Sequence, residues 1–316
     1  MAGSTGVPSR RSQHAAAGVL DRLPAWATTG VGSLPHTFPD HAAAHVAGEY
    51  DIPFCPQLPR LEGDMVHEWL GADPLRCGWG PDRDRERPAA WGAFLAAVTR
   101  RPPAHGVVKL QVTGPVTLAH ALEPDDAVAA GRLAREIAGW LAANASGQVA
   151  ALRERGLDAL LVVDEPALAA HPMPPRVWDP LRAVAPAWGL HLCCAVPWHI
   201  VDRAEPDVLS FDLAAGGVDR SGARVLARLL ARGGRIAWGV LAAHRPAERA
   251  AHAAWRLSAA LARLGASPAA VGSSSLLTAS CGTGRLSPRR EAEVTAALAY
   301  VASAARKALV TDRGPA

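Results

Sequence analysis

The 316-residue chain lacks the features that mark membrane and secreted proteins. No apolar run reaches the roughly 20 residues that a membrane-spanning helix needs, and the alanine-rich stretch near 296–305 is broken by polar residues. The N-terminus has two arginines but no apolar stretch typical of a secretory signal. We therefore expect a cytoplasmic protein with no membrane contact, with a disordered tail over residues 1–24 and a short tail over residues 311–316.

Cysteine is scarce and odd in number, with five thiols scattered along the chain: Cys55, Cys77, Cys193, Cys194 and Cys281. A disulfide framework needs an even, regularly spaced set and an oxidising compartment. The sequence meets neither condition. It therefore favours free thiols or a metal site.

Lysine is almost absent, since Lys109 and Lys307 are the only two among 33 basic residues. The arginines alternate with acids, as in residues 81–87, and the formal net charge is only +4. A nucleic-acid-binding surface needs a clustered basic stripe. We therefore expect no nucleic-acid partner.

The chain has an ordinary globular balance, with 49% hydrophobic and 20% charged residues. Short β-branched or apolar runs recur along its whole length and predict eight strands. The second of these is the weakest, because Pro53 and Pro56 would each remove a hydrogen-bond donor from the sheet. The predicted strands are Ala27–Leu34, Asp51–Leu58, Gly106–Gly114, Asp158–Pro166, Gly189–Val196, Val208–Ala214, Arg235–Leu241 and Ser274–Cys281.

Helical periodicity separates many of these runs and is clearest over 125–156, 221–231, 247–264 and 288–309. Alternating strands and helices predict parallel pairing, and eight such units predict an α/β fold of the (β/α)8 TIM-barrel type, a single domain over residues 25–310. The alternative, an open doubly wound sheet, lacks its usual glycine fingerprint. Residues 60–105 are rich in glycine and proline, and we expect them to form an elaborated connection beside the barrel mouth.

The pair His191-Leu-Cys193 lies on a predicted strand, where residues two apart face the same side. Asp212 ends the next predicted strand and Cys281 ends the last, the positions where a barrel places functional groups. One nitrogen, one carboxylate and two thiolates suit tetrahedral zinc. The sequence thus predicts a Zn²⁺ site, whereas Cys194 should face away and pack.

Several short motifs occur in order over nearly the whole chain: Val31-Gly-Ser33, Asp64-Met-Val66, Thr113-Gly-Pro-Val-Thr117, Val163-Asp-Glu-Pro-Ala-Leu168, His191-x-Cys193, Asp207-Val-Leu-Ser-Phe-Asp212, Gly239-Val-x-x-x-His244-x-Pro246 and Cys281-Gly282. Together they resemble the catalytic barrel of the cobalamin-independent methionine synthases. Members of that family are zinc-dependent (β/α)8 enzymes that methylate homocysteine to methionine.

The resemblance implies a role for each matching residue. His191, Cys193 and Cys281 match the zinc ligands, and Asp212 stands where the family has a glutamate ligand. The strand end at Val31, Gly32 and Ser33 would hold the carboxylate of homocysteine, and Asp164 its ammonium group. A second ammonium contact falls at His67 or the adjacent Glu68, of which we expect Glu68 to serve. His244 matches the family's acid catalyst.

The methyl donor is less well specified than the acceptor. Ala121 stands where the family has a tryptophan that stacks on the folate pterin, and we expect a single barrel where full-length members have two. The expected partners are therefore homocysteine and either methyltetrahydrofolate or a methylcorrinoid carrier. A positioned acid such as His244 would protonate the poor amine leaving group of a folate, an effect typically worth ~10²–10⁴ in rate.

Three other functions remain open. A zinc alkyltransferase for another thiol, such as a coenzyme M-type acceptor, would share the ligands but needs no amino-acid clamp of the kind that Ser33 and Asp164 indicate. A uroporphyrinogen-type decarboxylase shares the barrel but needs no zinc. A non-catalytic zinc- or homocysteine-binding relative would not need His244.

Overall fold

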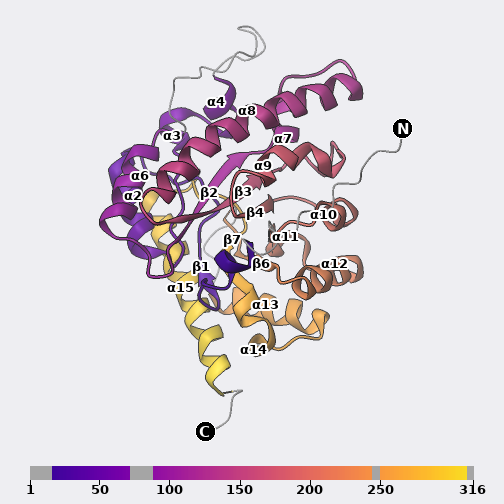
Figure 1. Cartoon of the computed structure of the whole chain (residues 1–316). Coiled ribbons are helices and arrows are strands. Elements are labelled where there is room, and N and C mark those ends of the chain that lie inside the picture. Colours follow the sequence, from indigo (N-terminus) through magenta and orange to yellow (C-terminus); the bar gives the residue numbers. More distant parts are fainter. Residues whose placement is uncertain (1–15, 72–87, 244–249, 312–316) are drawn as a thin grey trace.

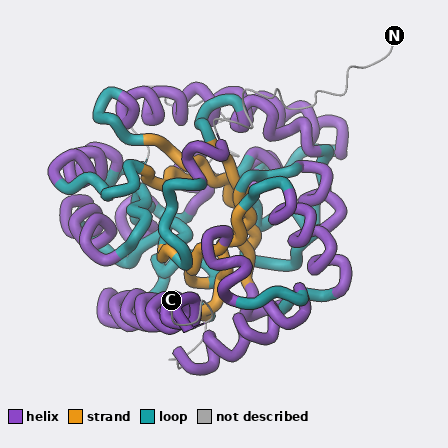
Figure 2. The backbone as a smooth tube through the Cα atoms, turned by 60° about the horizontal axis from the view of Figure 1, so that its bottom comes forward, coloured by secondary structure: helices purple, strands orange, loops and turns teal. Residues whose placement is uncertain are grey.

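The computed structural model describes residues 16–71, 88–243 and 250–311 and shows a parallel sheet surrounded by helices. The seven strands pair in the order β1-β7-β6-β5-β4-β3-β2, and every pairing is parallel. The sheet curls, and Figure 2 shows its strands at the centre with helices around them. Its strands are β1 (Ala27–Thr28), β2 (Val107–Thr113), β3 (Asp158–Asp164), β4 (Ala187–Leu192), β5 (Val208–Asp212), β6 (Arg235–Leu241) and β7 (Ser275–Ala279).

The predicted (β/α)8 barrel is thus confirmed only as a curled, TIM-like α/β sheet, because the eighth strand does not form among the described residues. The segment 51–58, predicted as the second strand, meets both edges of the sheet through single parallel bridges. Pro53 and Pro56 have no N–H to donate, so a continuous ladder cannot form there. The bridges join Phe54 to Lys109 on β2, and Gln57 to Ser33 beyond β1.

Strand β1 is also shorter than the predicted Ala27–Leu34. Beyond Thr28 the chain passes so close to the ring of Phe54 that a Cβ atom on Gly30 would lie 2.2 Å from it. Only glycine allows this approach. The stretch from Gly30 to Ser33 therefore runs as an irregular segment at the edge of the sheet.

Helices cover the outside of the sheet (Figure 1). The four predicted from periodicity form as α8, α12, α13 and α15, although residues 247–249 of the third lie outside the described residues. Ser287 precedes α15, and its Oγ accepts from the N–H of Arg290 at 3.2 Å. The helices are α2 (Pro39–Glu49), α3 (Pro59–Glu62), α4 (Met65–Leu70), α6 (Trp91–Arg100), α7 (Pro115–Ala121), α8 (Ala127–Arg153), α9 (Asp179–Arg182), α10 (Trp198–Ala204), α11 (Leu213–Gly216), α12 (Arg220–Ala231), α13 (Ala250–Leu264), α14 (Pro268–Val271) and α15 (Pro288–Thr311), with 3₁₀ turns at Pro175–Trp178 and Gly272–Ser274.

The start of the described chain is not a disordered tail, which corrects part of the prediction for residues 1–24. Residues 16–20 are helical, and four apolar side chains of this segment are buried. They pack on inward-facing residues near the N-terminal ends of the strands, including Val107, Leu160 and Val208. The segment thus closes the end of the sheet opposite the predicted site. The four buried side chains are those of Ala16, Val19, Leu20 and Leu23.

None of the helices in the described parts of the chain combines the length and apolarity that a bilayer crossing requires.

Candidate metal centre

Three of the four predicted metal ligands come together at the C-terminal ends of the strands. His191 lies near the end of β4, Cys193 directly follows that strand, and Cys281 follows β7. The candidate ligand atoms of these three residues all lie within 4.8 Å of one another. This arrangement of one imidazole and two thiols can hold a metal ion.

The imidazole of His191 is oriented for coordination. Its Nδ1 atom lies 2.8 Å from the hydroxyl Oγ of Ser210, which stands opposite it on β5. The side chain is buried, and its other ring nitrogen, Nε2, has no hydrogen-bond partner. A buried nitrogen without a partner is costly, and a metal ion held by the two nearby thiols would satisfy it. The donor set therefore fits a thiophilic metal such as zinc.

A hydrogen bond joins the two thiols and shifts their pKa values in opposite directions. A hydrogen bond with Cys193 lowers the pKa of Cys281 to about 4, and this effect together with the adjacent His191 outweighs the burial of the thiol. The same hydrogen bond raises the pKa of Cys193. Cys194 takes no part, since its thiol donates to the carbonyl of Pro166 at 2.8 Å.

The fourth predicted ligand, Asp212, is not among the three clustered residues. It ends β5 and caps the short helix α11, where its Oδ1 accepts from the N–H groups of Ala214 (2.7 Å) and Ala215 (2.9 Å). Asp212 is buried. Its role as a zinc ligand stays a prediction.

Asp164, the predicted ammonium partner, ends β3 directly beside His191 in the sheet register. It is 4% exposed, and its Oδ1 atom has no hydrogen-bond partner. Burial raises the pKa of Asp164 to about 6, although the charges of His191 and Lys109 oppose this rise. A buried carboxylate with an unsatisfied oxygen is suited to receive a cationic group.

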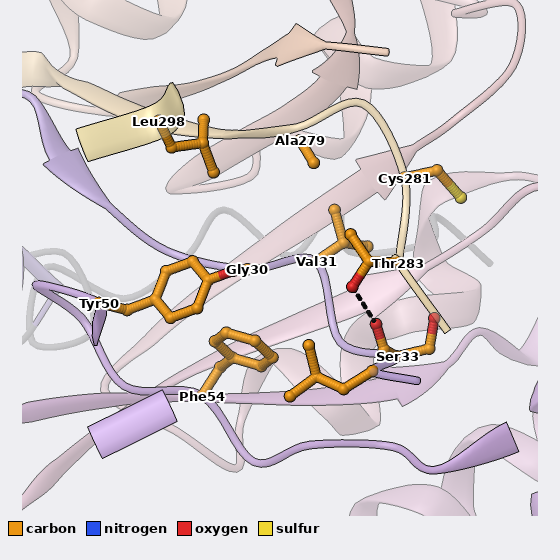
Figure 3. Close-up of a pocket in the computed structure, with 10 residues that line it drawn as sticks. Gly30, Val31, Ser33, Tyr50, Phe54, Ala279, Cys281, Thr283 and Leu298 are labelled. Carbon is orange, nitrogen blue, oxygen red and sulfur yellow. Dashed lines mark hydrogen bonds between the residues drawn. The ribbon is translucent and has the colours of Figure 1, made fainter. Parts of the chain in front are cut away.

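Ser33 lies beside the metal cluster at the edge of a small cavity. Cys281 and Ser33 both line that cavity, with apolar side chains such as Phe54 and Leu298 on its other side (Figure 3). The carbonyl of Ser33 accepts from the N–H of Thr283 at 2.8 Å, which ties the Gly30–Ser33 segment to the loop after β7. Val31 also lines the cavity.

His67 and Glu68, the two candidates for the second ammonium contact, differ in burial. His67 is exposed on α4, and its ring lies 2.9 Å from the carboxylate of Asp64. Glu68 is 3% exposed, and its Oε2 accepts from the side-chain amide of Gln57 at 2.7 Å. Glu68 therefore faces the interior, as the predicted role requires.

Sequence reasoning missed two polar residues inside the sheet, Lys109 and Gln111 on β2. Both are buried, and the Lys109 ammonium donates to Gln111 Oε1 at 3.2 Å. A signal for them was present: they alternate with Val108, Leu110 and Val112, a period of two that puts them on the inner face. The predicted acid catalyst, His244, lies outside the described residues.

The chain matches no protein-family model, and no curated protein matches it. The methionine synthase resemblance therefore stays a prediction that depends on the motifs and on the geometry of the site.

Proposed function

We propose that this protein is a zinc-dependent methyltransferase that transfers a methyl group to the thiol of homocysteine and forms methionine. The observation that carries the proposal is the His191, Cys193 and Cys281 cluster at the C-terminal ends of parallel strands. This is the end at which barrel enzymes place their active sites. The proposal includes a (β/α)8-type barrel in which bridges from residues 51–58 replace the second strand.

Zinc at this cluster would supply one function: it lowers the pKa of a bound thiol, so that a thiolate nucleophile is present near neutral pH. His191, Cys193 and Cys281 would hold the ion, and Asp212 is the proposed fourth ligand. Ser210 fixes the imidazole of His191 through its hydrogen bond to Nδ1. Two thiolates and a carboxylate would offset the charge of the ion.

The rest of the site suits an amino acid. The buried Asp164 offers an unsatisfied oxygen to an ammonium group, and Glu68 faces the interior of the same mouth. The backbone from Val31 to Ser33 would bind the carboxylate. His244 would donate a proton to the leaving group where the donor is a folate amine.

The direct test is methionine formation. The zinc-loaded protein is incubated with homocysteine and, separately, with methyltetrahydrofolate (mono- and polyglutamate) or methylcobalamin. Methionine in at least one of these reactions supports the proposal. If none forms, while a thiol without an amino-acid end is alkylated by the same donors, the protein is an alkyltransferase for another thiol. If the protein binds zinc and homocysteine but alkylates nothing, it is a non-catalytic binder.

The clamp for the amino acid has its own test, the substitution Asp164→Asn. A buried ammonium needs a charged partner, so this change should weaken homocysteine binding by about tenfold or more and leave the zinc content unchanged. Calorimetric titration of the zinc-loaded protein measures the first quantity, and metal analysis the second.

Asp207→Asn is the matched control for that substitution. Asp207 is a half-buried carboxylate before the start of β5 that accepts from the N–H of Trp188 at 3.1 Å. Its substitution should leave homocysteine affinity within about twofold of the wild type. Equal losses in both variants, or none in Asp164→Asn, would contradict the clamp.

A further inference from the structure

Lys109 places a buried positive charge inside the sheet, close to the proposed substrate site. The side chain is 4% exposed, although lysine is rarely buried. Within the described part of the chain, both hydrogen bonds of its ammonium go to neutral oxygens, the backbone carbonyl of Val31 and the side-chain amide of Gln111. The ammonium also lies 5.8 Å from the centre of the Phe54 ring. Burial of this kind without a direct carboxylate partner is costly, so a purely structural role would favour an apolar residue.

The carbonyl that Lys109 binds belongs to the segment expected to receive the substrate carboxylate. The Gly30–Ser33 segment lies beyond the end of β1 and has no regular ladder to hold it. Lys109 reaches the Gly30–Ser33 segment from β2, at the place where the predicted second strand does not form. The contact therefore supplies part of the support that a continuous strand would have given.

Gln111 and Gln57 complete the support. A Cβ atom on Gly32 would lie 2.8 Å from Oε1 of Gln57 and 3.0 Å from Cγ of Gln111, so both side chains pack directly against this glycine. Gln111 also donates to the carbonyl of Cys55. Lys109 thus belongs to a group of buried polar side chains that fixes the segment from one side.

We propose that Lys109 is a positioning residue that selects α-amino-acid thiols, because it fixes the Val31–Ser33 backbone for the substrate carboxylate. The inference rests on the proposed function. It adds to that function the residue that makes the site specific for an amino-acid acceptor. It predicts that recognition of the amino-acid end, and not of the thiol, depends on Lys109.

The test compares homocysteine with 1-propanethiol, which has the thiol but no amino-acid end. Lys109→Met keeps the length of the side chain and removes the charge and the donor. In the zinc-loaded variant we expect homocysteine affinity to fall by about tenfold or more, propanethiol affinity to stay within about twofold, and the zinc content to stay at the wild-type level. Unchanged preference for homocysteine over propanethiol would overturn the proposal.

Arg235→Met is the matched control. Arg235 is a buried cation on β6, 5% exposed, but it pairs with Asp21 at the opposite end of the sheet. It should lower stability without changing the preference between the two thiols. If Lys109→Met does not fold, the double variant Lys109→Met/Asp164→Asn removes both buried charges. Homocysteine binding of that double variant at the level of Asp164→Asn alone would overturn the proposal, and a further loss supports it.

A second measurement separates this inference from the proposed function. If the zinc-loaded wild type does not prefer homocysteine, the proposed function fails. The positioning role of Lys109 is then tested by amide hydrogen exchange over residues 29–34. The exchange rate should be at least about tenfold higher in Lys109→Met than in Arg235→Met. Equal exchange in the two variants shows that Lys109 does not position this segment.

Discussion

At the scale of single residues, two sulfur atoms are central to the candidate metal centre. A serine hydroxyl is a poor zinc ligand at neutral pH, whereas a cysteine near a cation is a thiolate. Cys193→Ser and Cys281→Ser should therefore each lower the zinc content from about one per chain to well under half of that value. Metal analysis after dialysis against a weak chelator measures the change.

The neighbouring thiols are matched controls for this prediction. Cys194 is next to Cys193 in sequence, but its thiol donates to a backbone carbonyl, and Cys55 is buried in the hydrophobic core. Cys194→Ala and Cys55→Ala should keep the full zinc content. Stoichiometric zinc in either serine variant would show that the cluster is not the binding site.

At this scale the sequence was sufficient to find the three clustered residues and insufficient for their surroundings. His191 and Cys193 could be found because spacing along one strand is local, and Cys281 because strand ends meet at one edge of a parallel sheet. The hydrogen bond between His191 and Ser210 and that from Lys109 to Val31 join residues far apart in sequence. Such contacts depend on register and depth in the folded sheet, which no local pattern gives.

At the scale of elements, a buried acidic network joins α2 to α15. Glu291, on α15 and 1% exposed, lies 2.9 Å from Nε2 of His45 on α2. It also accepts from the hydroxyls of Tyr50 (3.1 Å) and Thr295 (2.8 Å). Burial raises the pKa of Glu291, but the hydrogen bond and charge of His45, together with the two hydroxyls, lower it below its ordinary value of 4.5.

This depressed pKa predicts a pH dependence of stability. The contribution of the Glu291 carboxylate is present above about pH 4.5, the unfolded-state value, and is lost as the pH falls through the lower folded-state pKa. Glu291→Gln should therefore lower the free energy of unfolding by about 1–3 kcal/mol at pH 7.5 and by progressively less below pH 4.5. Urea unfolding over this pH range measures the difference.

Glu293→Gln, two residues further along α15, controls for that experiment. Glu293 pairs with Arg289 and Arg290 on the exposed side of the helix. Exposed pairs contribute little, so its substitution should change stability only slightly at any pH. A Glu291→Gln effect of equal size at pH 7.5 and at pH 3 would contradict the role of the ionised carboxylate.

The elements themselves were largely predictable, and the exceptions have physical causes. Seven of the eight predicted strands form, because continuous apolar runs are typical of strands buried on both faces. The exception is the segment with Pro53 and Pro56, which cannot donate to a ladder. Helices α8, α12, α13 and α15 follow their periodicity. The 60–105 connection has too many glycines and prolines for one helix, and its described parts include the short helices α3, α4 and α6.

At the scale of the whole molecule, the N-terminal segment closes one end of the sheet. Leu20 is 2% exposed and packs among the inward-facing side chains at the strand starts. Leu20→Ala should therefore cost about 2–4 kcal/mol in the free energy of unfolding, as measured by urea titration. Arg22→Ala removes a partly exposed ion pair to Asp158 and an exposed hydrogen bond to the carbonyl of Gly18, and it should cost no more than about 1 kcal/mol. Equal small effects would show that the segment does not contribute to the core.

This segment also shows what the sequence alone did not reveal about the molecule. Residues 16–23 have only a few apolar side chains and one turn of helix, too little to fold by themselves. Residues 16–23 are ordered because they pack on inward-facing residues that eight separate parts of the chain bring to one end of the sheet. Ile52, Ala187 and Leu276 are among these inward-facing residues. A prediction from local pattern therefore assigned them to a tail.

At the scale of the whole molecule, the proposed reaction also depends on which methyl donor the protein uses. Ala121 ends α7, the helix that follows β2 at the mouth of the sheet, where the resemblance expects a tryptophan that stacks on a pterin. Losing one aromatic stacking contact removes ~1 kcal/mol beyond its buried area. We therefore expect weak binding of methyltetrahydrofolate and faster turnover with a methylcorrinoid, whose leaving group needs no proton.

The variant His244→Asn distinguishes the two donors. A folate amine is a poor leaving group unless an acid protonates it, so with methyltetrahydrofolate the substitution should nearly abolish turnover, a loss on the order of 10²–10⁴-fold. With methylcobalamin it should change the rate by less than about threefold, because no proton is transferred to the leaving corrinoid. Initial rates of methionine formation by the wild type and the variant, measured with each donor, test this directly. Rapid turnover of micromolar methyltetrahydrofolate by the wild type, lost in His244→Asn, would show that a folate is the donor in spite of Ala121.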